Sequence, residues 1–280
     1  MSLGRILFKR WQYTLGAGLL IMFILLALFG TVLYPNGTPI NPANVYGPPT
    51  WSAPFGTDFA GRNILGEVVL GTRFVLEIAG LAGVFTLVLG VSIGLLTGMV
   101  GGIVDTIFMR MIDFFLSVPS YPLLIIIADL IHTQSIVVLA IILSLWGWAG
   151  MARAIRSQVL TLKRREYIEA ANSLQMPRLY IATREVFPAL MPYVVMHLIM
   201  AITGAVYGEV GLFFLGLIPI KADNWGLMLN WAYSVSGAIY SKSSILFMAA
   251  PLLAIILFQT GSVFFNQALE EFFNPNLQYR

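Results

Sequence analysis

Nucleophilic chemistry is the first possibility that the residue types raise, because Gly90-Val91-Ser92-Ile93-Gly94 fits the G-x-S-x-G pattern of a serine nucleophile. Such a serine needs a histidine base. The chain has only 2 histidines, His132 and His197, and neither has a supporting acidic motif. It has 0 cysteines, which excludes a thiol nucleophile, a disulfide framework and an iron–sulfur cluster. The methionines are scattered, as packing residues are. We therefore expect no enzyme, no catalytic residue and no metal site.

Carboxylates in apolar surroundings are the second possibility. Glu77, Asp113, Asp129 and Glu209 lie in or near long apolar runs. Ionisable groups are costly there and usually face protein or water. Asp113 and Glu209 are candidates for the lining or gate of a transport pathway, but each could equally pair with a neighbouring base such as Arg110. For Asp129, near the end of a run, pairing or an interfacial position is favoured.

Glycine recurs every fourth residue at positions 90, 94, 98 and 102. On a helix this spacing makes one smooth face, which lets another helix approach closely in lipid. This packing interpretation also accounts for the G-x-S-x-G match without any chemistry.

The composition indicates a membrane protein. Of 280 residues, 58% are hydrophobic and 10% are charged, with a mean hydropathy of +0.84, whereas soluble domains are about 25% charged. The net charge is +3, but where the charges lie matters more than their sum, and no nucleic-acid partner is expected. Membrane lipid is the solvent that suits such a chain.

Six segments meet the requirement of about 20 apolar residues for a transmembrane helix. They are 11–34, 78–104, 112–131, 133–152, one within 186–217, and 243–269. The first is longer than the roughly 7–15 apolar residues of a signal peptide, so we expect a retained anchor.

Orientation follows from the basic residues, which favour cytoplasmic loops. With the N-terminus inside, twelve of the 16 basic residues fall in inner segments: Arg5, Lys9, Arg10, Arg110, Arg153, Arg156, Lys163, Arg164, Arg165, Arg178, Arg184 and Arg280. The outer segments hold the other four, Arg62, Arg73, Lys221 and Lys242. We therefore predict an all-α membrane protein with six transmembrane helices and with both the N- and the C-terminus cytoplasmic.

Two segments lie outside the predicted spans. Residues 35–72 form an outer excursion rich in Pro, Gly and Asn that is followed by a short interfacial helix, and residues 153–185 form a charged inner loop. The expected organisation is an N-terminal part, residues 1–72, with the tail, the first span and the outer loop. A five-helix core, residues 73–280, follows and contains the inner loop.

The inner loop predicts a helix–turn–helix beneath the membrane. Glu166 to Leu174 suits a short helix, and Pro177 disfavours helix at Met176 and can start a second helix. Small Ala170 and Ala171 beside Glu169 would let this element sit in a groove of another protein. From the residues alone, a solvated loop is an equally good interpretation.

Several motifs in this order resemble the binding-protein-dependent ABC importer permeases, in particular the dipeptide/oligopeptide/nickel class. The inner loop carries Glu169-Ala170-Ala171 and, at the expected separation, Phe187-Pro188. The preceding Ser157-Gln158-Val159-Leu160 and Arg165-Glu166-Tyr167 are also similar. Gln175 stands where the family usually has Gly, which would give a helix-ending turn its positive φ. We expect Gln175 to alter that turn slightly.

The outer loop extends the resemblance. Pro54-Phe55-Gly56-Thr57-Asp58-Phe59-Ala60-Gly61-Arg62 is similar to the P-F-G-T-D-x-x-G-R element of this class. Locally, Thr57 or Asp58 could cap the following helix, and Asp58 could pair with Arg62 at i, i+4. Further matches are Met109–Asp113, Val118-Pro119-Ser120 and Glu209–Leu217.

The resemblance implies a type I ABC importer-like permease of the cell membrane whose cytoplasmic coupling helices dock on an ATPase. The matching coupling residues are Glu166, Tyr167, Glu169, Ala170, Ala171, Leu174, Gln175 and Pro177. The implied partners are a second permease subunit, two cytoplasmic ATPase subunits and an extracytoplasmic substrate-binding protein. The chain lacks G-x-x-x-x-G-K-[ST], so ATP and Mg²⁺ are expected on partner subunits and no cofactor on this chain.

The predicted function is half of a translocation pathway for di- and oligopeptides. Oligosaccharides and nickel are alternative substrates for the same class. A secondary transporter or channel is the alternative from another class, but such carriers usually show repeated halves with broken helices at the midplane, and we find no internal repeat.

Overall fold

The computed structural model describes residues 3–219, 223–240 and 244–273, and every regular element within them is a helix. In chain order these are α1 (Leu3–Leu7), α2 (Trp11–Leu33), η1 (Pro42–Asn44), α3 (Ile64–Val100), α4 (Gly102–Ser117), α5 (Ser120–Ile131), α6 (Ile136–Leu162), α7 (Glu166–Ser173), α8 (Arg178–Tyr180), η2 (Ile181–Val186), α9 (Phe187–Phe214), α10 (Trp225–Ser234) and α11 (Ile245–Phe273). The predicted all-α class is confirmed. Of the basic residues used to orient the chain, Lys221, Lys242 and Arg280 lie outside the described residues.

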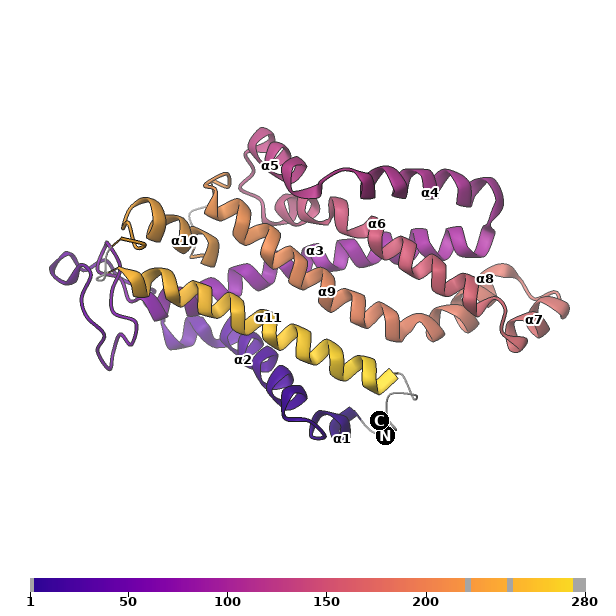
Figure 1. Ribbon diagram of the computed structural model, residues 1–280, viewed down its shortest axis with the longest axis horizontal. Helices are drawn as coiled ribbons and strands as arrows, with labels where there is room; N and C mark the ends of the chain where they lie inside the picture. The colour runs from indigo at the N-terminus through magenta and orange to yellow at the C-terminus, as the bar shows by residue number, and fades with distance from the viewer. Residues whose placement is uncertain (1–2, 220–222, 241–243, 274–280) are drawn as a thin grey trace.

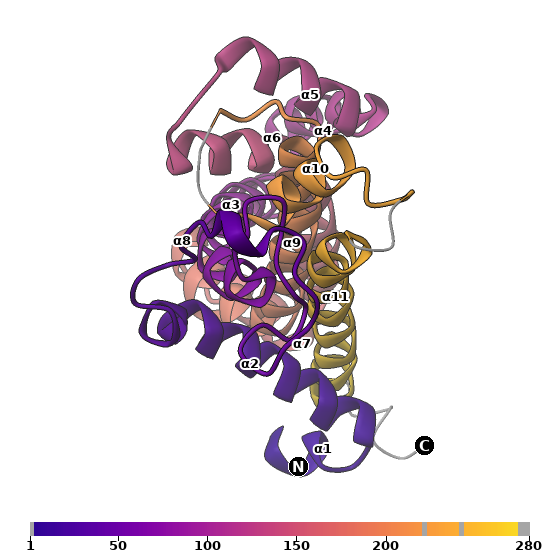
Figure 2. The same ribbon diagram turned by 90° about the vertical axis from the view of Figure 1, so that its left-hand side faces the viewer.

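The long helices form an elongated bundle. Figures 1 and 2 show α3 and α9 in its middle, with α2 and α11 on one side and the α4–α5 pair on the other. The loop between α2 and α3 lies with α10 at one end of the bundle, and α7 lies at the other end (Figure 1). We call these the loop end and the α7 end.

Five helices in the described part of the chain are long and apolar enough to cross a membrane. They are α2, α3, α6, α11 and the continuous run from α8 through α9, residues Arg178–Phe214. The span predicted at 112–131 is instead a broken pair, because α4 and α5 meet at 86°. The break follows from Pro119, which disfavours helix at the residue before it, and Val118 is indeed extended (φ −90°, ψ 131°). Counting this pair as one gives the expected six.

Helix α3 differs most from the sequence expectation. It runs for 37 residues, or about 55 Å, well beyond the roughly 30 Å of a hydrocarbon core. The separate interfacial helix expected between the outer excursion and the span at 78–104 was wrong, because α3 is continuous from Ile64 to Val100. The boundary expected between residues 72 and 73 therefore lies inside this helix.

The glycine stripe packs α3 against α6. A Cβ added to Gly90 would lie 2.7 Å from Cβ of Met151, and one added to Gly98 would lie 2.6 Å from Cβ of Val159. Gly94 faces Ala152 and Ile155 of α6 in the same way. The predicted packing role is confirmed for these three glycines, whereas Gly102 is the first residue of α4, with φ +59°. The side chain of Ser92 is exposed.

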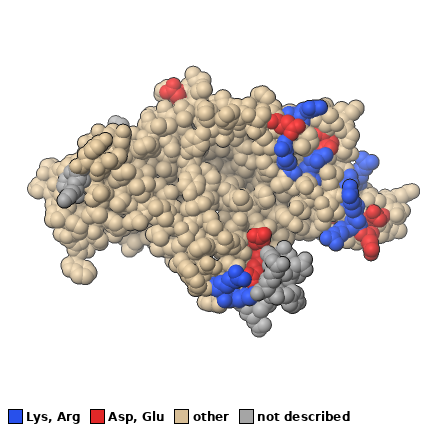
Figure 3. Space-filling view, in the orientation of Figure 1, with Lys and Arg blue, Asp and Glu red and all other residues tan. Residues whose placement is uncertain are grey.

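Charged side chains gather unevenly along the bundle. In Figure 3 Lys and Arg lie in the half that contains α7 and the contact between α1 and α11, and the middle of the visible face shows no charged side chain. The described residues thus place the expected inner segments toward one end.

Candidate functional site

Helix α7 begins where the sequence predicted it. Arg165 before it is extended (φ −78°, ψ 140°). Glu166 and Glu169 lie in its first turn, where carboxylates stabilise the positive end of the helix dipole.

The end of α7 is a Schellman turn. Met176 N donates to Ala171 O at 3.2 Å and Gln175 N donates to Asn172 O at 3.0 Å, which satisfies carbonyls that the helix end leaves free. Gln175 has φ +51°, the left-handed conformation that glycine usually supplies. The altered turn expected from Gln175 was therefore wrong. Pro177 is the N-cap of α8, one position before the expected one.

The two faces of α7 have different environments. Ile168 is fully buried and Ala171 is 7% exposed, and both pack in one cluster with Val159 of α6 and Ile181 of η2. The opposite face is exposed; it consists of Glu166, Tyr167, Glu169, Ala170 and Leu174. The sequence predicted the same role for Ala170 and Ala171, whereas the side chain of Ala171 packs within its own chain.

Segment η2 connects α7 to a long transmembrane helix. It is π-helical from Ile181 to Val186 and continues into α9 without leaving the right-handed helical region, since Phe187 has φ −59° and ψ −45°. Ile181 and Val186 are both buried in the cluster that holds Ile168. The exposed helix α7 is thus seated on the segment that leads into α9.

Ion pairs brace the α7 end. Asp105 of α4 accepts hydrogen bonds from Nε and Nη2 of Arg156 of α6 at 2.5 and 2.6 Å. Asp113 of α4 pairs with Arg153 of α6, and both side chains are about half exposed. The partner of Asp113 is thus Arg153, not the neighbouring Arg110.

At the loop end, Arg62 is the centre of a buried cluster. Its Nε and Nη2 donate to Asp58 Oδ2 at 2.8 and 2.5 Å, so the predicted i, i+4 pair is confirmed. Its Nη1 lies 2.9 Å from Glu67 Oε1, close enough for an ion pair but without hydrogen-bond alignment. The guanidinium also lies over two rings, 5.3 Å from the Phe59 centroid and 4.8 Å from the Trp231 centroid. Both carboxylate side chains are fully buried.

The loop backbone is shaped by two glycines and two polar side chains. Gly56 and Gly61 have φ of +74° and +75°, and a Cβ at Gly61 would overlap the carbonyl oxygen of Asn41. Thr57 Oγ1 accepts from Gly47 N at 2.7 Å, and Phe55 packs against the main core. The cap of α3 is Asn63, which accepts from Gly66 N at 3.2 Å. The expectation that Thr57 or Asp58 would cap this helix was therefore wrong, because both are occupied within the loop.

Asp223 extends the Arg62 cluster. Burial raises the pKa of the Asp223 carboxyl, the positive charge of Arg62 opposes that shift, and the negative charge of Asp58 adds to it. This part of the loop end therefore carries more carboxyl groups than the single arginine can balance.

Glu209 forms a second buried contact near the loop end. Asn224, which caps α10, donates to Glu209 Oε1 at 2.5 Å and accepts from Gly226 N at 2.7 Å. Glu209 is fully buried, and among the described residues its Oε2 has no hydrogen-bond partner. It ties α10 to α9 and, like Asp113, is not among the residues that line the two cavities beside α9.

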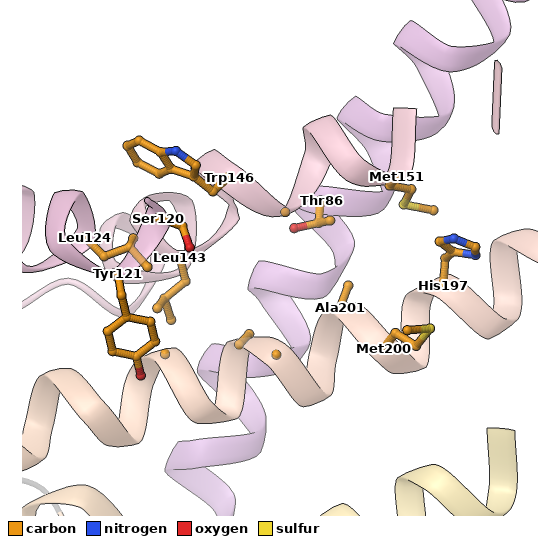
Figure 4. A pocket seen from close by; sticks show the side chains of 14 residues that line it. Thr86, Ser120, Tyr121, Leu124, Leu143, Trp146, Met151, His197, Met200 and Ala201 are labelled. Atoms are coloured by element: carbon orange, nitrogen blue, oxygen red, sulfur yellow. The ribbon is translucent and has the colours of Figure 1, made fainter. Parts of the chain in front are cut away.

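Those two cavities were not predicted from the sequence. One, of about 320 Å³, lies between α3, α5, α6 and α9 and is lined in part by Trp146, His197 and Met200 (Figure 4). The other, of about 310 Å³, lies between α9 and α11 and is lined in part by Gln259 and Asn266. The available signal was a set of uncharged polar residues inside otherwise apolar spans. Among the described residues, no group of three or more His, Asp or Glu could hold a metal ion.

Comparison with known proteins gives consistent matches. The chain is 31% identical over 218 residues to the oligopeptide transport system permease protein OppC of Bacillus subtilis (strain 168), covering 77% of this chain and 71% of that protein. It is 30% identical over 220 residues to the dipeptide transport system permease protein DppC of the same organism, covering 76% and 68%. A putative peptide permease protein of Brucella suis biovar 1 (strain 1330) is 28% identical over 257 residues, covering 90% and 84%.

The family match covers most of the helical bundle. Residues 90–274 match the family described as binding-protein-dependent transport system inner membrane component, a stretch that begins in the last third of α3 and includes α4 to α11. Together with the apolar spans, this match makes the chain a multi-pass protein of the cell membrane that belongs to the family of binding-protein-dependent transport system inner membrane components.

Proposed function

We propose that this chain is a permease subunit of an ATP-binding-cassette importer and forms half of the translocation pathway for di- and oligopeptides. The names of the relatives support peptides over oligosaccharides or nickel. The family match supports a permease subunit over a secondary transporter or channel.

The observation that carries this proposal is the two-faced helix α7. One face is anchored in the chain through Ile168 and Ala171, while the other presents two carboxylates, Glu166 and Glu169, beside Ala170 and the apolar side chain of Leu174, which is 73% exposed. A short helix held by one face and exposed on the other suits a groove of a partner. Ala170 sets the distance of approach, and Glu169 meets a polar or basic group.

The partner in that groove is an ATPase subunit in this proposal. Two such subunits hold the ATP and Mg²⁺, a second permease completes the pathway, and an extracytoplasmic binding protein delivers the peptide. Residues 73–280 act as the core, and the loop of residues 35–63 rims the entrance, held in shape by the Arg62 cluster.

This assignment needs the α7 end in the cytoplasm and the loop end outside. Because the chain has 0 cysteines, single cysteines report position cleanly. In intact cells, Asn44→Cys should react with an impermeant maleimide and Ser173→Cys should react only after lysis. Labelling of Ser173→Cys in intact cells would reverse the proposed orientation.

The coupling role is tested by two variants of the exposed face, Glu169→Lys and Ala170→Trp. Losing one desolvated charge pair costs about 2–5 kcal/mol, which is roughly 30- to several-thousand-fold in affinity. Both variants should insert normally and lose ATPase subunits in a pull-down, together with peptide uptake in vesicles. Asp129→Lys is the matched control, because it makes the same change of charge at an exposed position on α5, away from α7.

Ala171→Trp separates docking from folding. This change overfills the buried cluster and should lower the thermal stability of the chain itself, whereas Ala170→Trp should not. Wild-type ATPase binding and uptake in both Glu169→Lys and Ala170→Trp would show that α7 is not the coupling element.

A further inference from the structure

The exposed face of α9 lies between two cavities. Met200 is 58% exposed and lines both the cavity of about 320 Å³ toward α6 and the cavity of about 310 Å³ toward α11. His197, one turn earlier, faces the first cavity, and Thr203, one turn later, faces the second. We call the surface formed by these two cavities and the strip of α9 between them the α9 surface.

The first cavity contains hydrogen-bonding groups without charge. Trp146 and Thr86 lie on one side of it and His197 and Met200 on the other (Figure 4). The Nε1 of Trp146 is buried, and among the described residues it has no hydrogen-bond acceptor. The Nδ1 of His197 lies 3.0 Å from the carbonyl oxygen of Tyr193. Because a carbonyl only accepts, this nitrogen carries the hydrogen, which leaves Nε2 available as an acceptor when the ring is neutral.

The second cavity presents acceptors. Gln259, Ser262 and Asn266 are spaced as one face of α11. The side-chain oxygens of Gln259 and Asn266 are both buried and, within the described part of the chain, have no donor. These residues lie in the middle and inner half of a transmembrane helix, where an unpaired polar group in lipid costs several kcal/mol. They therefore need a partner, and rotation of either side chain toward the cavity would let water or a substrate supply one.

Charged side chains are nearly absent from the α9 surface. The residues lining the first cavity include no Asp, Glu, Lys or Arg, and those lining the second include only Glu270, near the end of α11. Peptides differ in their side chains but share backbone N–H and C=O groups. Uncharged donors and acceptors can form hydrogen bonds with those backbone groups, and they do not bind the charged termini of a peptide tightly.

We propose that the α9 surface lines the water-filled translocation pathway and contacts the peptide backbone through the neutral groups of Trp146, His197, Gln259 and Asn266. This inference rests on the proposed importer function. It predicts that one pathway accepts peptides of different charge, since none of these contacts depends on the side chain of the peptide.

Cysteine accessibility tests the location. In the assembled importer, Met200→Cys and Gln259→Cys are compared with Ile21→Cys, which lies at an exposed position of α2 outside both cavities. A charged methanethiosulfonate reacts with the thiolate, which forms in water and not in lipid. We expect modification of Met200→Cys and Gln259→Cys at least tenfold faster than of Ile21→Cys, with loss of peptide uptake and protection by excess peptide. Equal rates would overturn the proposed location.

Substitution tests the mode of contact. Gln259→Leu should lower uptake several-fold, and by the same factor for peptides with Lys, Glu or Ala side chains. Thr260→Val is the matched control, because Thr260 is the next residue of α11, lines neither cavity and donates only within its own helix, to Ile256 O at 2.8 Å. A loss confined to one charge class, or no loss, would refute backbone recognition.

The same assays distinguish a failure of this inference from a failure of the proposed importer function. If the unmodified importer with native Met200 takes up no peptide, the proposed function fails. If it takes up peptide and Met200→Cys is not modified faster than Ile21→Cys, only the α9 surface fails.

Discussion

Arg62 is the residue whose removal should have the clearest local effect. Its guanidinium is 14% exposed and contacts the fully buried carboxylates of Asp58 and Glu67 at 2.5 and 2.9 Å. Arg62→Met keeps much of the apolar stem but leaves both carboxylates without their base. Removing one partner of a buried ion pair costs about 3–5 kcal/mol, and the two rings that flank Arg62 lose a cation as well.

That cost should appear as local opening of the loop. The amides of Tyr46 and Thr57 donate to Asp58 O and Gly47 O at 3.1 and 3.2 Å, so they report the loop directly. A loss of 3–5 kcal/mol predicts hydrogen exchange that is roughly 100- to several-thousand-fold faster at these amides. The amide of Met176, at the other end of the bundle, should be unchanged and serves as the internal control.

A second substitution tests the cause. In Arg62→Met/Glu67→Gln one buried charge is removed with its partner, and Asp58 keeps backbone donors from Ala60 N and Arg62 N at 2.9 and 2.7 Å. Replacing a buried pair costs far less than breaking one, so the double variant should regain at least half of the lost protection. Exchange less than tenfold faster in Arg62→Met, or no recovery in the double variant, would refute the ion-pair reasoning.

Three further changes test local geometry. Gln175→Gly should remove the strain of a non-glycine residue in the left-handed conformation and stabilise the turn by about 1 kcal/mol. Hydrogen exchange of the Met176 amide should then be slower, with peptide uptake unchanged. Faster exchange would contradict this prediction. Gly94→Ala should destabilise the solubilised chain by about 1–3 kcal/mol, because the added Cβ would lie 2.6 Å from Ala152 O. Gly80→Ala is the control, since a Cβ there has no atom within 4 Å. Equal melting temperatures for the two variants would count against the packing argument. Because the pKa of Asp223 is raised above its usual 3.8, the folded chain holds that proton longer and stability should fall as pH rises from 3.8 through the raised value. Asp223→Asn should flatten that part of a thermal-unfolding pH series, and an unchanged series would exclude Asp223 as its source.

Hydropathy located the spans well, because lipid demands a long apolar helix wherever the chain crosses. It failed at the start of α3, because residues 64–72 were assigned to the outer excursion. Glu67 is tolerated there because its carboxylate forms an ion pair with Arg62, and such a pairing depends on tertiary structure. Pro119 could have suggested the break between α4 and α5, but the 86° angle depends on how both halves pack.

Within the inner loop the motif located the helix but not its faces. Ala170 and Ala171 are alike in size, and only helix phase distinguishes them. Ala171 follows Ile168 by three residues and shares its buried face, so the spacing did contain this information. The role of Gln175 could not be predicted, since a non-glycine residue adopts positive φ only where the surrounding turn compensates.

The α9 surface was missed for a different reason. Trp146, His197 and Gln259 are far apart in sequence, and none belongs to a recognisable motif. Each is unremarkable alone in a span. Only the packing of the bundle brings them together around α9, where buried polar atoms of Trp146 and Gln259 have no hydrogen-bond partner among the described residues.

The π-helical segment η2 lies between α7 and α9, so it is the element through which a movement of α7 would reach the α9 surface. Ile181 and Val186 are both buried in the cluster that seats α7. In a regular α-helix residues five apart would point about 140° away from each other, whereas i→i+5 hydrogen bonding brings them to the same side. Deleting Thr183, an exposed residue of this segment, makes the two residues four apart and should leave an ordinary α-helix with both side chains still buried.

We therefore expect the Thr183 deletion to keep the fold and the ATPase contact of α7 but to remove an irregular and adaptable turn. Peptide uptake should fall at least tenfold while ATPase subunits remain bound in a pull-down. Thr183→Ala is the control, because it removes only the hydrogen bonds from Thr183 Oγ1 to Leu179 O and Tyr180 O and retains the length of the segment. Wild-type uptake by the deletion variant would show that η2 is a passive connection, since the chain would then transmit the movement equally well through a regular helix.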